Sequence, residues 1–549
     1  MSNTSESWDY LILTAANDDQ AAAYEAQIRM RREAGQLTQV RDTLVVADPE
    51  GRRVGSGGST LQCLLEVLRR EAEAGRSIGD FAAAEKVLRG LRILIVHAGG
   101  DSRRLPAYSP CGKIFVPLPG DSPSVVTPTL FDRLVPAFLD LPAGPPGEGQ
   151  IVVASGDALI LFDRSEVGCM RAGITALGSK VSPEEAARHG VFCPNADGSV
   201  RLYLQKPDLQ RQAESGAIGA DGLSVLDIGV MSLDAGAAVR LLRCFCDVRV
   251  QAIEWTPAAW HIVLTHGIDL YREICCALGT DATFEEYVRT VRSSGSKLEE
   301  PVLAELFAEL RTIPFHLQML RQCSFLHFGS SSQLITSGEE LITLDTGVPP
   351  VNTLLTIGTE IESSGNIDGV DSWVESCRVR APLILRGRNV VVSVDVFEPF
   401  ELAEGACLDL SPGYDRNGLK IWFVRYYGID DTFKQARFSG KPLAEWLRAV
   451  GAADSKIWDG DTPESERTLW NARMFPAETA HENYRRWQWM LDIDHATAEQ
   501  KNNFLSADRY SSAEIAVRVD QDAWHARRAA IRASYSTSLA SPSREPAKP

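Results

Sequence analysis

One short segment of the chain combines a glycine pair, two arginines and a lysine in a spacing that suits phosphate chemistry. The segment HAGGDSRRLPAYSPCGK runs from His97 to Lys113 and follows an apolar stretch typical of a strand. Gly99 and Gly100 allow the backbone to turn sharply and bring N–H groups close to phosphate oxygens, where a Cβ atom would obstruct the approach. We therefore expect both glycines to bind a nucleotide.

The basic residues of this segment indicate the class of reaction. Arg104 and Lys113 can neutralise charge on a triphosphate as it is attacked, and we expect them to be catalytic, with Arg103 helping to bind the nucleotide. Nucleotidyl transfer depends on positioning and electrostatic stabilisation far more than on covalent chemistry. The segment is not a Walker A loop, because Ala107 stands where the first glycine belongs and Ile114 follows the lysine. A surface turn with salt-bridging arginines is the alternative.

A second glycine-rich segment lies earlier in the chain. VGSGGST follows the apolar run TLVVA and precedes LQCLLEVLRREAEAG, which has the composition of a helix. A loop between a strand and a helix suits the approach of a base or a phosphate. Gly57 and Gly58 are therefore candidate nucleotide-binding residues, and a tight structural turn is the alternative.

These loops must be positioned by a sheet, and the first half of the chain has the matching pattern. Short apolar runs that alternate with helical segments predict an α/β fold with a mostly parallel sheet and helices on both faces. The predicted strands include residues 10–13, 43–47, 93–96, 151–154 and 225–231.

After about residue 345 the pattern changes to a spacing of six. Eight apolar residues follow one another at this interval, which is the period of a hexapeptide β-helix in which three steps complete one coil. They are Leu355, Ile361, Ile367, Trp373, Val379, Leu385, Val391 and Phe397. Ordinary strands are the alternative.

The remaining sequence completes the expected domain organisation. From about Leu443 helical segments rich in aromatic residues follow, and the final polar, Pro- and Ser-rich stretch is typical of disorder. We expect a nucleotide-binding domain over 1–345, a β-helix domain over 346–435, a helical region over 436–533 and a disordered tail over 534–549.

Composition limits the possible partners. The 549 residues are 44% apolar and 23% charged, and the net charge of −17 would repel nucleic acids and anionic membranes. No apolar run approaches the 18 residues of a membrane helix, and the first residues lack a basic leader. We expect a cytoplasmic protein that binds neither nucleic acid nor membrane, with its 11 cysteines as scattered reduced thiols.

Six segments spread from Trp8 to Pro476 carry the most specific pattern. They are WDYLILTAAN, DPEGRRVGSGGSTL, HAGGDSRRLPAYSPCGKIFVPLP, FLHFGSSSQ, YYGIDDTFK and LWNARMFP. Together they resemble the fucose-1-phosphate guanylyltransferase family, which also forms the N-terminal part of bifunctional fucokinase enzymes. The resemblance implies a Rossmann-like GT-A nucleotidyltransferase domain, a left-handed β-helical domain, and synthesis of GDP-fucose and pyrophosphate from GTP and fucose 1-phosphate with Mg²⁺.

The resemblance also implies roles for residues outside the glycine loops. Asp157, which follows an apolar strand, corresponds to a metal-binding aspartate, and Asp269 suits the second metal position. Lys206 and Asp227 correspond to residues that bind the sugar phosphate and its hydroxyls. The alternatives are a turn aspartate for Asp157, a surface lysine for Lys206 and a helix cap for Asp269.

Other functions stay open beside this one. The base and the sugar are set by loops that the sequence does not define, so another sugar 1-phosphate is possible. A fucokinase is disfavoured because no kinase domain is identifiable, and FGSSSQ, Phe328 to Gln333, is expected to be a connector rather than a kinase phosphate loop. A non-catalytic sugar-nucleotide sensor is the remaining class, and the joint presence of Arg104, Lys113 and Asp157 argues against it.

Overall fold

The computed structural model describes residues 7–100, 102–120, 127–168, 170–250 and 252–540. The chain forms two compact units, and each is built from three separate segments. The first unit comprises residues 1–25, 35–99 and 134–325, and the second comprises residues 26–34, 100–133 and 326–549. This division differs from the expected one, because the second unit begins before residue 345 and takes two segments from the N-terminal part of the chain.

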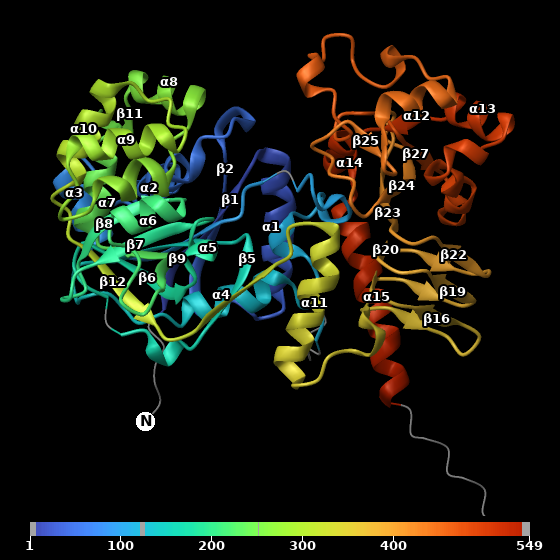
Figure 1. Ribbon diagram of the computed structural model, residues 1–549, viewed down its shortest axis with the longest axis horizontal. Coiled ribbons are helices and arrows are strands. Elements are labelled where there is room, and N and C mark those ends of the chain that lie inside the picture. Colours follow the sequence, from blue (N-terminus) through green and yellow to red (C-terminus); the bar gives the residue numbers. More distant parts are fainter. Residues whose placement is uncertain (1–6, 101, 121–126, 169, 251, 541–549) are drawn as a thin grey trace, which may run out of the picture. The chain divides into compact units, whose positions relative to one another are not determined.

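The first unit is built around a mixed sheet. Its central strands lie in the order β12-β6-β9-β4-β3-β1-β2, with β7 paired to β9 and β8 paired to β7 (Figure 1). The bounds are β1 Trp8–Ala15, β2 Val40–Ala47, β3 Arg92–His97, β4 Gln150–Ser155, β6 Ile174–Val181, β7 Gly190–Pro194, β8 Val200–Gln205, β9 Ser224–Leu233 and β12 Phe315–Leu320. The predicted α/β class and all five predicted strands are confirmed.

One part of the sheet departs from the expected parallel pattern. The strands β2, β1, β3 and β4 run parallel, whereas β9 runs antiparallel to both β4 and β6. The carboxyl ends of the four parallel strands therefore meet at one edge. The loops that follow these strands contain the glycine pair after β3 and Asp157 after β4.

The helices of the first unit cover the sheet with apolar faces. In α2 (Gly55–Glu73) Leu61, Leu64 and Leu68 repeat at helical spacing and are buried in the core cluster of this unit. The helices α3 (Phe81–Leu88) and α7 (Ala235–Arg243) pack in the same region. No helix of the described residues is long and apolar enough to cross a membrane.

The second unit contains a strand coil (residues 354–414) made of three short parallel sheets. Each turn of the chain adds one strand to each sheet, so that β16, β19 and β22 stack in register (Figure 1). The first sheet contains β14 Leu354–Ile357, β17 Ser372–Glu375, β20 Asn389–Val392 and β23 Ala406–Tyr414; the second β15 Glu360–Ile361, β18 Arg378–Val379 and β21 Asp395–Val396; the third β16 Asn366–Gly369, β19 Pro382–Leu385 and β22 Phe400–Leu402.

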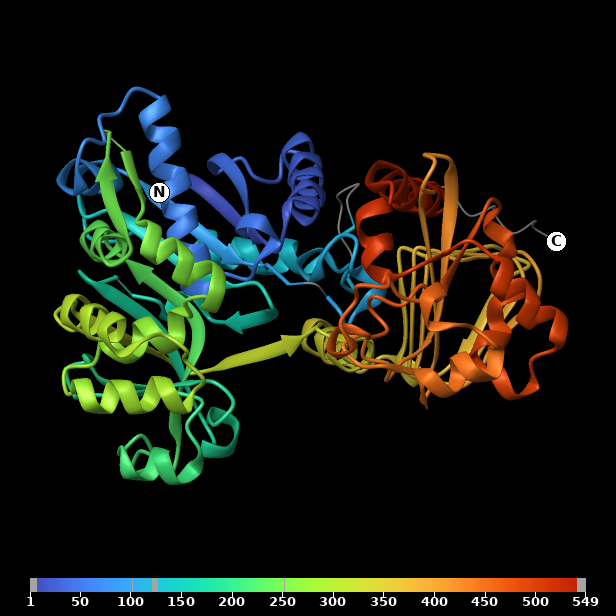
Figure 2. The same cartoon turned by 90° about the horizontal axis from the view of Figure 1, so that it is seen from above.

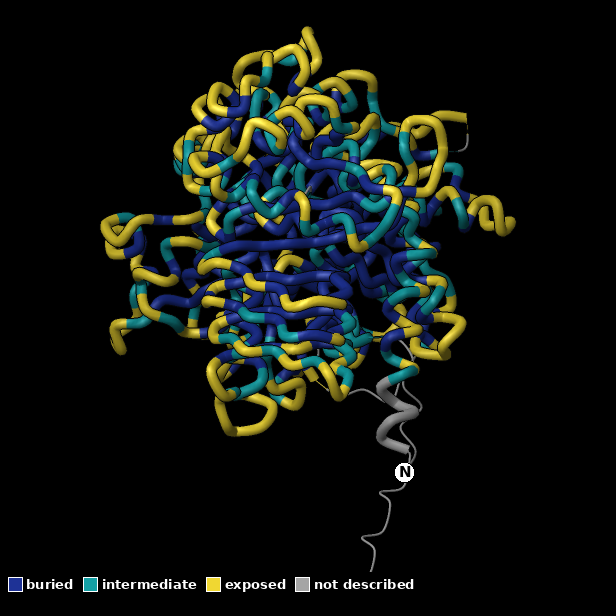
Figure 3. Tube along the Cα trace, turned by 90° about the vertical axis from the view of Figure 1, so that its right-hand side faces the viewer, coloured by how far each residue is buried: buried dark blue, intermediate teal, exposed yellow. Residues whose placement is uncertain are grey.

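The spacing of six holds for the first two sheets over the first turn of the coil and is lost in the third, where Ile367 pairs with Leu383. Leu355 pairs with Trp373, but Trp373 pairs with Val390, so the second turn is one residue shorter than the first. The same slip makes Val396 the partner of Val379, and Phe397, the last residue of the predicted series, is 47% exposed. Buried strands bordered by exposed loops dominate the view of Figure 3.

Helices and further strands follow the coil. The antiparallel strands β24 (Lys420–Gly428), β27 (Phe475–Glu478) and β28 (Arg509–Tyr510) extend the first sheet. Of the helices α12 (Leu443–Val450), α13 (Ala498–Ser506), α14 (Ser512–Arg518) and α15 (Gln521–Ala540), the last packs against β15 and β23 (Figure 2). Residues 534–540, expected in the tail, belong to α15, and residues 541–549 lie outside the described residues.

Candidate active site

The predicted phosphate segment divides between the two units. Gly99 belongs to the first unit, where its N–H group lies 3.3 Å from the hydroxyl oxygen of Thr14 on β1. The same hydroxyl accepts a hydrogen bond from the N–H of Ala98 at 3.1 Å. Gly100 and the residues after it belong to the second unit. The turn after β3 is thus held by the neighbouring strand, and Gly99 is exposed at the end of it.

The basic residues lie in what we call the basic loop (residues 102–113). Arg104 is exposed and Lys113 half-buried at the start of a short 3₁₀ turn. The backbone carbonyl of Arg104 accepts a hydrogen bond from the N–H of Ser331 at 3.1 Å. The guanidinium of Arg103 lies over the ring of Trp470, 5.7 Å from its centre, so part of this side chain serves packing.

The basic loop is anchored on the strand coil and on the C-terminal elements. The indole N–H of Trp373, on β17, donates to the hydroxyl of Tyr108 at 2.9 Å. Arg425, on β24, lies 3.3 Å from the hydroxyl oxygen of Ser109, and Gln521 donates to the carbonyl of Pro110 at 2.9 Å. These buried contacts fix the backbone that carries the two predicted catalytic cations.

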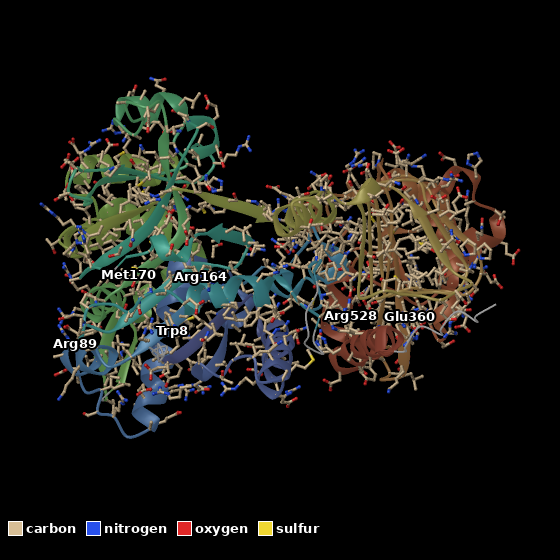
Figure 4. All side chains as sticks on the ribbon, turned by 90° about the horizontal axis from the view of Figure 1, so that it is seen from below. Trp8, Arg89, Arg164, Met170, Glu360 and Arg528 are labelled. Atoms are coloured by element: carbon tan, nitrogen blue, oxygen red, sulfur yellow. The ribbon has the colours of Figure 1, made fainter. Side chains whose placement is uncertain are left out.

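A buried ion pair lies behind this anchor. Glu375 on β17 and Arg528 on α15 are joined by two hydrogen bonds of 2.9 and 2.7 Å, and Figure 4 labels Arg528. The hydroxyl of Tyr108 lies 3.4 Å from the same carboxylate. Burial and this negative charge raise the pKa of Tyr108 well above its usual value, so the phenol stays protonated and remains a donor.

The first unit holds the predicted acidic residues. Asp157 lies exposed in the turn after β4. Asp227 on β9 is only 6% exposed and accepts hydrogen bonds of 2.8 Å from the hydroxyl of Tyr203 and from the N–H of Gly229. Burial raises the pKa of Asp227 to about 6, against the effect of these two hydrogen bonds.

Tyr271 experiences the charge of these carboxylates and was missed by the sequence reasoning. Burial and then the charges of neighbours that include Asp227, Asp269 and Asp157 raise its pKa well above the usual value. A Cβ atom on Gly229 would lie 3.7 Å from the hydroxyl oxygen of Tyr271. The negative charges of all three predicted aspartates therefore act on the hydroxyl of Tyr271. Its position two residues after Asp269 was the signal available in the sequence.

Asp269 has the capping role that was the alternative for it. Its Oδ1 atom accepts hydrogen bonds from the N–H groups of Tyr271 at 3.0 Å and Arg272 at 2.8 Å, and it begins the helical turn Leu270–Ile274. The same residue lines a cleft of about 830 Å³ together with Lys206. Asp269 therefore caps a helical turn and also lines the cleft.

Lys206 lies directly after β8 in an unusual backbone conformation. Its φ of +48° is in the left-handed region, which is costly for a residue other than glycine. Its N–H donates to the carbonyl of His189 at 2.9 Å, and its side chain is exposed at the cleft. Strain of this kind persists only where the surrounding structure enforces it. The strained backbone places the exposed side chain of Lys206 at the wall of the cleft.

The second glycine segment is part of a helix rather than an open loop. The helix α2 begins at Gly55, and the N–H groups of Gly57 and Gly58 donate to the carbonyl of Ile268 at 2.8 and 3.1 Å. A Cβ atom on Gly57 would lie 3.0 Å from that carbonyl oxygen. Close approach of two backbone segments therefore explains these glycines, and their N–H groups already have acceptors.

The two predicted metal ligands, Asp157 and Asp269, could bind a magnesium ion only if oxygen atoms of the substrate supplied further ligands. Among the residues that the structure describes, no group of three or more His, Cys, Asp or Glu side chains could hold a metal by itself. Mg²⁺ commonly takes one or two carboxylates and completes its octahedron with phosphate oxygens and water. Asp157 and Asp269 are consistent with that kind of donor set.

Comparison with known proteins identifies relatives for most of the chain. Residues 85–480 match the model of the fucose pyrophosphorylase domain. The chain is 26% identical to a bifunctional fucokinase/GDP-fucose pyrophosphorylase of Arabidopsis thaliana over 92% of this chain and 50% of the relative. It is 25% identical to an L-fucokinase/L-fucose-1-P guanylyltransferase of Bacteroides fragilis over 89% of this chain and 48% of the relative, so it spans about half the length of these two proteins. A fucose-1-phosphate guanylyltransferase of Mus musculus is 25% identical over 86% of this chain and 84% of the relative.

Proposed function

The chain belongs to the fucose pyrophosphorylase family, and from this premise we propose that it is a nucleotidyltransferase that joins a sugar 1-phosphate to a nucleoside monophosphate and releases pyrophosphate. GTP and fucose 1-phosphate are the favoured substrates, and GDP-fucose the favoured product. The names of the relatives support this choice. The observation that carries the proposal is the cleft of the first unit that Lys206 and Asp269 line together.

In the first unit we assign the acidic residues and Lys206 to substrate binding. The exposed ammonium group of Lys206 suits a sugar phosphate, and Asp227 suits sugar hydroxyl groups, which donate hydrogen bonds to a carboxylate. Tyr271, which stays protonated, is a further donor beside Asp227. We assign the exposed Gly99, at the end of β3, to nucleotide binding.

Asp157 and Asp269 would hold Mg²⁺, which when bound would withdraw charge from the α-phosphate and from the departing pyrophosphate. Asp157 follows the end of β4 and is exposed. Oδ1 of Asp269 accepts hydrogen bonds from two N–H groups, and these hydrogen bonds fix the orientation of the carboxyl group.

In the second unit we assign Arg104 and Lys113 to the triphosphate. Both belong to a loop whose backbone is anchored by buried hydrogen bonds at Tyr108 and Ser109. Preorganised charge on such a loop would stabilise the negative charge that develops during the reaction. We also propose that the first unit is a GT-A nucleotidyltransferase domain and that the strand coil is the left-handed β-helix expected from the family.

The decisive experiment is a pyrophosphate-release screen of the purified protein with each nucleoside triphosphate against a panel of sugar 1-phosphates. We expect turnover with GTP and fucose 1-phosphate in the presence of Mg²⁺. Formation of ADP from ATP and free fucose would instead identify a fucokinase. Tight binding of GDP-fucose without turnover of any pair would identify a sensor.

A further inference from the structure

The first unit contains a second pocket, apart from the cleft described above. It has a volume of about 850 Å³ and lies between α2, the strand β11 (Ala252–Trp255) and the start of α8 (Pro257–His266). Figure 1 labels these three elements in the same part of the first unit. Among the described residues, none that lines this pocket also lines the cleft. We call it the tryptophan pocket, because Trp255 and Trp260 line it.

The walls of the tryptophan pocket are mainly apolar. Leu65 and Leu68 line it from α2, and Ile253 lines it from β11. Leu68 and Ile253 are buried, whereas Leu65 is only half-buried. An apolar surface in a concave site is stabilised when a ligand displaces water from it, and a volume of this size suits an organic molecule rather than a single ion.

The two tryptophans add an aromatic surface. Their ring centres lie 5.8 Å apart with the ring planes inclined at 49°, and both side chains are half-buried. The indole N–H of Trp255 donates to Oε1 of Gln62 on α2 at 2.9 Å, and the ring of Phe245 lies beside it with the centres 6.3 Å apart. These contacts hold the ring of Trp255 in place. Indole is the aromatic side chain that attracts cations most strongly.

The charged residues of the tryptophan pocket have an excess of negative charge. Glu66, Glu73 and Glu254 line it, and Arg69 is the cation among its lining residues. Arg69 forms ion pairs with Glu66 and Glu73 along α2. Glu254 is exposed on β11, and within the described part of the chain it has no ion-pair partner. The charges therefore favour a ligand that carries a positive charge.

We propose that the tryptophan pocket binds an organic cation with an apolar or aromatic body. The body would lie against Leu65, Leu68 and Ile253. The positive charge would lie beside Trp260 and Glu254, where a ring face and a carboxylate both attract it. This site does not depend on the reaction proposed for the cleft, because the two share no lining residue among those described.

Two probes of similar size and opposite charge test the class of ligand. They are naphthylmethyl-trimethylammonium and naphthylmethanesulfonate, each titrated calorimetrically into the full chain. We expect the ammonium probe to bind at least about tenfold more tightly, because the carboxylate excess attracts one probe and repels the other. Its binding should also weaken as the salt concentration rises. Equal affinities, or no binding of the ammonium probe at millimolar concentration, would overturn the proposal.

Two variants with matched controls locate the bound probe. Trp260→Ala should weaken binding of the ammonium probe about fivefold or more, because one ring face is lost. Trp489→Ala removes a half-buried tryptophan of the second unit and should leave binding unchanged. Glu254→Lys would balance the charges of the pocket and should remove the preference for the ammonium probe, whereas Glu445→Lys, at an exposed residue of the second unit, should not.

The charge variant keeps the test decisive if Trp260→Ala does not fold. Glu254 is exposed, so its replacement by lysine leaves no buried group without a partner. A wild-type preference for the ammonium probe in Glu254→Lys would show that the probe binds elsewhere and would overturn the proposal. Unchanged affinity in a folded Trp260→Ala variant would do the same.

Discussion

Two cations on one anchored loop, Arg104 and Lys113, are the residues whose removal should affect turnover most directly. We expect Lys113→Ala and Arg104→Ala each to lower kcat by roughly 10² to 10³, the usual effect of removing one preorganised charge partner. Steady-state kinetics at saturating GTP and fucose 1-phosphate measures this. Near wild-type turnover in either variant would remove that residue from the triphosphate site.

Asp157 allows a separate test of the metal. In Asp157→Asn a neutral amide replaces a carboxylate of almost the same shape, and an amide holds a hard cation poorly. We expect loss of Mg²⁺-dependent turnover with an unchanged thermal transition, because the side chain is exposed and the change is nearly isosteric. A titration of turnover against Mg²⁺ concentration that matches the wild type would contradict the assignment.

Asp227 gives a prediction about pH. Its pKa in the folded protein is about 6 and its ordinary value is 3.8, so between these values the folded state holds a proton that the unfolded state has lost. Stability conferred by this residue therefore falls as pH rises from about 4 to about 6, by up to about 3 kcal/mol. The stability of the Asp227→Asn variant should not show this decrease between about pH 4 and about pH 6.

Chemical unfolding of both proteins at several pH values in that range measures the difference. The free energy of unfolding of the wild type, relative to that of Asp227→Asn, should decrease with rising pH. A difference that stays constant, or that increases, would show that Asp227 is ionised in the folded protein at low pH.

At the scale of elements, two residues of the predicted six-residue series in the strand coil differ in how far they are buried. Leu385 on β19 is 3% exposed, whereas Ile361 on β15 is 48% exposed. Leu385→Asp would bury an unpaired charge and should destabilise the second unit by several kcal/mol, on the order expected for such a group. Ile361→Asp should change little. Differential scanning calorimetry measures the midpoint of thermal unfolding of each variant, and we expect a lower midpoint for Leu385→Asp only. Equal midpoints would contradict the packing of the coil described above.

The elements also show how far the sequence predicts the structure. Apolar runs located the strands because a buried strand needs them, but β9 is antiparallel, and a run of apolar residues has no direction. The spacing of six indicated the coil, yet the shorter second turn depends on the pairing of Trp373 with Val390. VGSGGST was expected to be a loop because glycines disfavour helices, and close packing against Ile268 outweighs that preference.

For the candidate site, the residue types were predictable and the neighbours were not. Asp157, Asp227 and Asp269 are far apart in the chain, and only the fold determines that the charges of all three act on Tyr271. Only the fold brings such positions together.

At the scale of the molecule, the second unit depends on segments from the N-terminal part of the chain. The side chain of Arg31 is fully buried and forms an ion pair with Asp132 at 2.6 Å, and Gln27 lies 2.9 Å from His525 on α15. A fragment of residues 326–549 would lack these partners and the basic loop. We expect it to show no cooperative unfolding transition by circular dichroism, and a transition like that of the full chain would contradict this dependence.

The interleaved segments impose an order on biosynthesis. Residues 26–34 and 100–133 leave the ribosome early, but most of the second unit, to which they belong, starts at residue 326. At 5–20 residues per second, synthesis of residues 134–325 takes roughly 10 to 40 s. During that interval apolar side chains such as Ile114 and Phe115 lack the rest of their unit. Chaperones can therefore bind these exposed apolar side chains while the rest of the chain is synthesised. Overproduction without added chaperones should reduce the folding yield of the second unit before that of the first.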